Sequence, residues 1–140
     1  MINLNDFPCG IRSGLYLECD GKIEKVYRGY KTNLYDDESD DINNESESEG
    51  YLLQTINGKA LDSYSRALIT YDRLGKLGFK RDMPSPRYTY KCITIEFSFS
   101  SGEHVFYYIT KAKKHIVCKY LDEIQLNYEK EYNVLPVFEE

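Results

Sequence analysis

Residues 88–100, YTYKCITIEFSFS, decide the fold, because they form the strongest β-strand pattern in the chain. β-Branched and aromatic residues recur here at a period of two, which is typical of a strand. One face of this strand would carry Ile93, Ile95, Phe97 and Phe99, and the other Tyr88, Tyr90, Cys92 and Thr94. The pattern predicts a single central strand that is covered on both sides.

The residues after this strand continue as an antiparallel meander. SSGE at 100–103 predicts a turn, and HVFYYIT at 104–110 predicts the returning strand. KAKK at 111–114 is a basic connection to a third strand, HIVCKY at 115–120. An amphipathic helix follows, because apolar residues then recur at three- and four-residue steps. They are Leu121, Ile124, Tyr128 and Tyr132, with Asp122 and Glu123 near the positive end of the helix.

The residues before this strand contain further strands and a helix. Residues 14–31, GLYLECDGKIEKVYRGYK, predict a hairpin, in which Asp20-Gly21 supplies a type I′ turn. YLLQTINGKA at 51–60 returns to strand character and ends at Asn57-Gly58. Residues 61–77 have helical periodicity at Leu61, Tyr64, Leu68, Tyr71, Leu74 and Leu77. We expect Asp62 or Ser63 to cap this helix and Gly78 to end it.

These elements predict an α+β fold in a single domain over residues 1–140. The fold would contain a mostly antiparallel β-sheet of about five to six strands, with two amphipathic helices. An acidic loop at 36–50 is inserted between two strands of one sheet. A polar connection of this length is unusual, and such loops are either functional or only solvated.

The acidic loop accounts for the negative charge of the whole chain. The net charge is −5, from 23 acidic and 18 basic residues. Eight of the acids are Asp36, Asp37, Glu38, Asp40, Asp41, Glu45, Glu47 and Glu49. Subtracting these eight from 23 leaves 15 acids against 18 bases, so the remainder is slightly basic. A cluster of like charges creates a strong local field, which can attract a basic partner.

The residue types needed for catalysis do not form a recognisable motif. Four cysteines lack Cys-x-x-Cys spacing, and Cys19, Cys92 and Cys118 are expected to be buried thiols. His115 and Cys118 would lie on opposite faces of a strand, because their spacing is odd. Cys92 and His104 across a hairpin form a second candidate pair. We therefore expect no enzyme activity, although an enzyme that uses Cys92, Cys118 or a histidine is an alternative.

Cofactor, metal and nucleic-acid sites are also disfavoured by the sequence. No glycine-rich phosphate loop is present, and DDESDD at 36–41 lacks the spacing of a calcium loop. We expect no cofactor and no bound metal. Three basic clusters are Arg66/Arg73/Lys76, Lys80/Arg81/Arg87 and Lys111/Lys113/Lys114/Lys119, with Tyr88, Tyr90, Tyr107 and Tyr108 nearby. The acidic loop would repel phosphate, so direct nucleic-acid binding is disfavoured.

The segment over residues 61–132 resembles small accessory proteins of bacteriophages that infect A/T-rich bacteria. The resemblance rests on LGKLGFKR at 74–81, the tyrosine-rich meander and the closing helix YLDEIQLNYEKEY at 120–132. In such proteins a Leu-Gly-Phe helix end leads into a strand meander and a short terminal helix. The resemblance implies a phage-encoded role, for which inhibition of a host defence or host enzyme is a common expectation.

We therefore expect a cytoplasmic, non-enzymatic inhibitor that binds a basic host protein and no membrane. Closely spaced carboxylates can imitate a row of phosphates and fill the nucleic-acid groove of a nuclease. The expected contact residues are Tyr35, Asp36, Asp37, Glu38, Asp40, Asp41, Glu45, Glu47, Glu49 and Tyr51. An immunity protein that neutralises a cognate toxin and a structural component are alternatives, and the sequence leaves the oligomeric state open.

Overall fold

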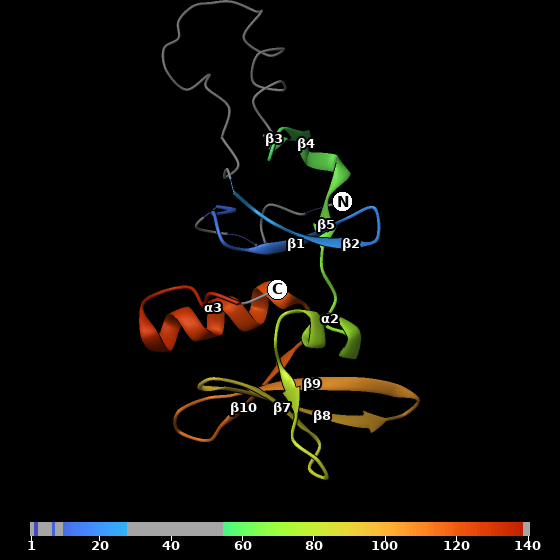
Figure 1. Ribbon diagram of the computed structural model, residues 1–140, viewed down its shortest axis with the longest axis vertical. Helices are drawn as coiled ribbons and strands as arrows, with labels where there is room; N and C mark the ends of the chain where they lie inside the picture. The colour runs from blue at the N-terminus through green and yellow to red at the C-terminus, as the bar shows by residue number, and fades with distance from the viewer. Residues whose placement is uncertain (1, 3–6, 8–9, 28–54, 139–140) are drawn as a thin grey trace, which may run out of the picture. The chain divides into compact units, whose positions relative to one another are not determined.

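The computed structural model describes residues 2, 7, 10–27 and 55–138 of the 140-residue chain (Figure 1). The chain divides into two compact units, Met1–Arg66 and Ala67–Glu140. Both units contain antiparallel sheets, and two α-helices lie in the second. The α+β class is therefore confirmed, whereas a single domain over residues 1–140 stays a prediction.

The first unit is built from short antiparallel strands. Its three-stranded sheet has the order β2-β1-β5, and its second sheet is the hairpin β3-β4. The bounds are β1 Tyr16–Cys19, β2 Lys22–Lys25, β3 Thr55–Ile56, β4 Lys59–Ala60, the 3-10 helix η2 Leu61–Ser63 and β5 Ser65–Arg66. Asp20-Gly21 and Asn57-Gly58 have positive φ at both positions, as a type I′ turn requires. The predicted turn at Asp20-Gly21 is confirmed, and Asn57-Gly58, predicted as the end of a strand, forms a turn of the same kind.

The second unit is a five-stranded antiparallel sheet with two helices. The strand order is β10-β9-β8-β7-β6. The bounds are α2 Tyr71–Lys76, β6 Lys80–Arg81, β7 Arg87–Tyr90, β8 Ile93–Ser100, β9 Glu103–Ile109, β10 His115–Cys118 and α3 Leu121–Tyr132. The predicted returning strand, third strand and terminal helix are confirmed. Glu123 accepts the Tyr120 N–H at 2.9 Å and so caps the first turn of α3.

One face of this sheet forms the core of the second unit. The register places Tyr88 and Tyr108 on either side of Ile95, which is completely buried. Both helices lie on this side of the sheet in Figure 1. Tyr71 of α2 packs its ring edge-on against Phe106 at 5.5 Å between centroids. Side chains of the opposite face, such as Glu96, are partly exposed, so the sheet is covered on one side.

The single strand predicted over residues 88–100 is wrong. The chain turns at Lys91 and Cys92, and Lys91 takes a φ of +54°. β7 then pairs with β8, which brings Tyr88 to the same face as Ile95. The alternation of residues is continuous through the turn, and no glycine or asparagine marks it. The sequence pattern of two strands therefore looks like that of one.

The helix predicted over residues 61–77 is wrong in its first ten residues. Ala67 and Ile69 are buried, while Leu68 between them is 43% exposed. Burial therefore alternates with a period of two residues, as in an extended chain. The backbone of this segment pairs with the residues before α3, through Ile69 N–H to Lys119 O at 2.9 Å. Thr70 is the N-cap of α2, because its hydroxyl accepts the Arg73 N–H at 3.1 Å. Gly78 follows the helix with a φ of +103°, as predicted.

The described strands on either side of the acidic segment belong to different sheets. β2 pairs with β1, whereas β3 pairs with β4. The prediction of two strands in one sheet is therefore wrong for the described residues. Also within these residues, the search for a helix of sufficient length and apolar character to cross a membrane finds none.

Candidate functional site

The predicted partner-binding residues fall in a part of the chain that the structure leaves out. Tyr35, Asp36, Asp37, Glu38, Asp40, Asp41, Glu45, Glu47, Glu49 and Tyr51 all lie outside the described residues. The nearest described residues are Tyr27 on one side and Thr55 on the other. The described contacts nearest to the acidic segment in the sequence are those of Tyr27 and of the β3–β4 hairpin.

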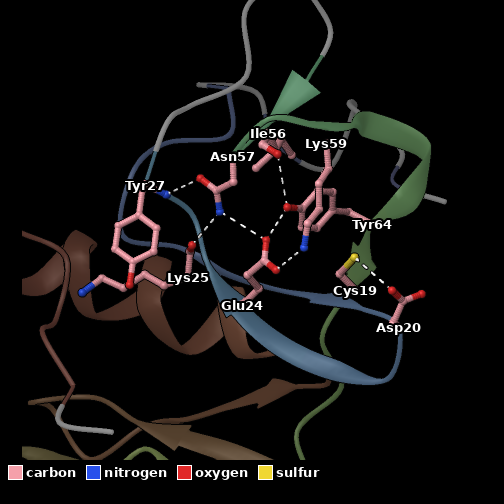
Figure 2. Close-up of polar contacts among 9 residues, drawn as sticks. All are labelled: Cys19, Asp20, Glu24, Lys25, Tyr27, Ile56, Asn57, Lys59 and Tyr64. Atoms are coloured by element: carbon pink, nitrogen blue, oxygen red, sulfur yellow. Dashed lines mark hydrogen bonds and ion pairs between the residues drawn. The ribbon is translucent and has the colours of Figure 1, made fainter.

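The side chain of Asn57 connects the β3–β4 turn to the end of β2. Its side-chain Oδ1 accepts the Tyr27 N–H at 2.7 Å, and its Nδ2 donates to the Lys25 carbonyl at 2.8 Å (Figure 2). Asn57 lies in the β3–β4 turn with a φ of +53°, a conformation that asparagine tolerates better than most residues. The chain at the end of β2 is therefore bonded to the turn between β3 and β4.

Glu24 extends this connection to β4 and to the residues after η2. Its carboxylate accepts from Lys59 Nζ at 2.7 Å and from Asn57 Nδ2 at 3.3 Å. It also accepts a short hydrogen bond from the Tyr64 hydroxyl, whose oxygen lies 3.2 Å from the Ile56 carbonyl. Figure 2 shows these groups converging on the carboxylate. We call Glu24, Asn57, Lys59 and Tyr64 the clasp.

The groups of the clasp shift the pKa values of one another. The hydrogen bond from Lys59, followed by that from Tyr64, holds the pKa of Glu24 below its ordinary value. Burial and the Glu24 carboxylate raise the pKa of Tyr64, so the phenol stays a neutral donor. Glu24 also raises the pKa of Lys59. The clasp is therefore an ionised acceptor surrounded by donors, and it is formed at neutral pH.

The clasp predicts a loss of stability in acid. Because the pKa of Glu24 is lower in the folded protein than its ordinary value of 4.5, its contribution is present above that pH. The contribution is lost as the pH falls through the folded pKa. We expect the unfolding free energy, measured by urea titration from pH 6 to pH 3, to fall less steeply in Glu24→Gln. Glu103→Gln, an exposed change on β9, is the control and should retain the steep fall. If the unfolding free energy of Glu24→Gln and that of the native protein fell equally steeply with decreasing pH, this account would be contradicted.

The candidate catalytic residues are not brought together. His104 pairs with Phe99 near the end of β8, and Cys92 immediately precedes that strand. The two are separated by about 23 Å along the strand, at 3.3 Å per residue. His104 Nδ1 instead contacts the Tyr71 hydroxyl. His115 is exposed and Cys118 is buried, which confirms their predicted placement on opposite faces.

Of the three cysteines that the structure describes, two are buried and one is exposed. Cys19 and Cys118 are buried and unpaired, as expected. Burial raises the pKa of Cys118 to about 12, so this thiol stays protonated and is a poor nucleophile at neutral pH. Cys92 is exposed, which corrects the expectation that it is buried. The reason is the turn between β7 and β8, which lifts Cys92 out of the sheet.

Two of the predicted basic residues, Lys76 and Arg87, form ion pairs within the described fold. Lys76 lies 3.3 Å from Asp72, and Arg87 lies 3.2 Å from Glu96. Tyr90 and Tyr108 are buried, so their rings belong to the core. In the described ranges, no three or more His, Cys, Asp or Glu side chains are grouped to hold a metal ion.

Comparison of this chain with protein-family models, with curated proteins and with solved structures gives no match. The site therefore rests on its own geometry. The sequence analysis placed the end of a strand at Asn57-Gly58 but missed the clasp. Glu24 and Tyr64 are 40 residues apart, and no local pattern relates them.

Proposed function

We propose that this protein is a non-enzymatic inhibitor that presents its acidic segment to a basic protein partner. The observation that carries the proposal is the clasp, which fixes the chain at Tyr27 and at Asn57. The eight acids lie between these two residues in the sequence. A segment attached at both ends loses less conformational freedom on binding than a free tail does.

The charge distribution supports a basic partner. Residues 1–66 contain 13 acidic and seven basic residues, and eight of those acids lie between 36 and 49. Such a concentration of carboxylates accelerates association with a basic surface and can occupy a groove that normally holds phosphates. A nuclease or another nucleic-acid-handling enzyme has a groove of this kind. In this proposal the protein acts in the cytoplasm, and its resemblance to phage accessory proteins supports an anti-defence role.

The experiment compares two variants with the same change in net charge. The first replaces Asp36, Asp37, Asp40 and Asp41 with asparagine, and the second replaces Asp20, Asp62, Asp72 and Glu103 with their amides. A partner is first isolated by pull-down from the native host at low and high salt and identified by mass spectrometry. Binding is then measured by calorimetry at both salt concentrations.

We expect the first variant to lose at least about tenfold in affinity for the partner. Its binding should also lose most of its dependence on salt, because the charge contacts that salt screens are removed. The second variant should retain both. Equal losses in the two variants would show that only net charge matters and would overturn the role of the segment. Rescue of cells from one specific toxin, without any effect on nucleases, would favour an immunity protein instead.

A further inference from the structure

A cavity of about 260 Å³ opens in the second unit, beside the β7–β8 turn and α3. It is separate from the clasp, and none of its residues belongs to the acidic segment. The residues that line it are Tyr90, Lys91, Cys92, Ile93, Tyr128, Val134, Leu135, Pro136 and Val137. Three elements therefore contribute walls: the turn, the helix and the chain that follows the helix.

The cavity is held open by contacts of its own walls. The Tyr90 hydroxyl donates to the Val137 carbonyl at 3.1 Å, which fixes the segment after α3. Phe138 then packs against Phe79 and Tyr90, with ring centroids 5.6 Å and 5.4 Å apart. The cavity is thus largely preformed, as small-molecule sites usually are.

The apolar part of the lining is aliphatic and reaches the surface. Ile93 is buried at the base, while Val134 and Val137 are 56% and 73% exposed. Leu135 and Pro136 complete this wall. Exposed aliphatic side chains beside a cavity indicate a surface that an apolar ligand can cover.

Each polar side chain of the lining can donate a hydrogen bond. These groups are the Lys91 ammonium, the Cys92 thiol and the hydroxyls of Tyr90 and Tyr128, and none of the described residues that line the cavity carries a carboxylate. Cys92 Sγ lies 3.9 Å from the Tyr128 oxygen. Burial and this neighbouring thiol raise the pKa of Tyr128, so its hydroxyl keeps its proton at neutral pH. The ammonium of Lys91 is the one ionised group among these side chains, so it favours an anionic acceptor at this end.

We propose that this cavity binds a small amphiphilic carboxylate, with its aliphatic chain on Ile93 and Leu135 and its carboxylate at Lys91. The volume lies below the usual range of drug-sized sites, which begins near about 300 Å³, so the ligand is short. The inference is independent of the proposed protein partner.

The test uses the exposed thiol of Cys92 as a reporter in the full-length protein. Cys92 is alkylated with iodoacetamide, and the rate is read by mass spectrometry of the peptide that contains it. Octanoate is the probe, used below its micelle concentration, and 1-octanol at equal concentration is the uncharged comparison. We expect octanoate to slow alkylation several-fold in a saturable manner, and octanol to slow it less.

Two lysine variants then separate binding in the cavity from a general effect of charge. Lys91→Gln should abolish the preference for octanoate over octanol. Lys113→Gln is the matched control, because Lys113 also has a positive φ in an exposed turn but does not line the cavity. No protection by octanoate, equal protection by octanol, or the same loss of preference in both variants would overturn the proposal.

Discussion

Replacing Ile95 with alanine is expected to destabilise the second unit by about 2–5 kcal/mol. Ile95 is completely buried at the centre of the five-stranded sheet, between Tyr88 and Tyr108. Alanine would remove apolar contacts and leave a cavity that these neighbours on adjacent strands cannot fill. The free energy of unfolding is measured by urea denaturation followed by circular dichroism, with an unchanged denaturant slope as evidence of an intact fold.

Thr94→Ala is the matched control for this substitution. Thr94 precedes Ile95 on β8 but points to the opposite, partly exposed face. Its replacement should cost less than about 1 kcal/mol, which is the range of β-propensity effects. A loss at Thr94 equal to that at Ile95 would contradict the assignment of the buried face.

Replacing Tyr64 with phenylalanine is expected to destabilise the first unit by about 1.5–3 kcal/mol. Tyr64 is 1% exposed, and phenylalanine keeps its packing while removing the hydroxyl. The variant therefore loses the hydrogen bond to the Glu24 carboxylate. Hydrogen bonds to charged groups are stronger than neutral ones, which places this loss above that of an average hydrogen bond. Thermal and urea unfolding of the native protein and the variant measure it.

A double-mutant cycle tests whether the loss arises within the clasp. Tyr64→Phe and Glu24→Gln are measured singly and together, and the two losses should not add. We expect a coupling energy of about 0.5–3 kcal/mol, as for other groups in direct contact. Additive losses would mean that the Tyr64 hydroxyl stabilises the protein through the Ile56 carbonyl alone.

The turns with glycine were predictable from the sequence, and the turn without it was not. Asp20-Gly21 and Ser101-Gly102 have the positive φ values that glycine and its partner supply. Lys91 adopts the same conformation without a local signal, so the pattern over residues 88–100 suggested one strand. The pairing of β7 with β8 is a tertiary preference that overrides local propensity.

α3 was predicted correctly and the helix over residues 61–77 was not, and the difference again lies in local signals. α3 has both apolar periodicity and Glu123, which caps it locally. Residues 61–70 have the periodicity, but the predicted cap at Asp62 or Ser63 is wrong, and their backbone finds partners elsewhere in the chain, at Lys119 and Leu121. The acids of the candidate site were evident from composition, whereas the clasp depends on contacts between residues 30 to 40 positions apart.

The hydrogen bonds of Asn57 have a consequence for how this protein can vary. Tyr27 and Asn57 are hydrogen-bonded to each other, and this contact does not depend on how many residues join them in the sequence. Halving the length of a closed loop changes its closure entropy by only about 0.6 kcal/mol. Chains engineered with a shorter or longer connection between Tyr27 and Asn57 should therefore keep the clasp. Under the proposed function, the first unit would then be a scaffold on which the acidic segment can be exchanged.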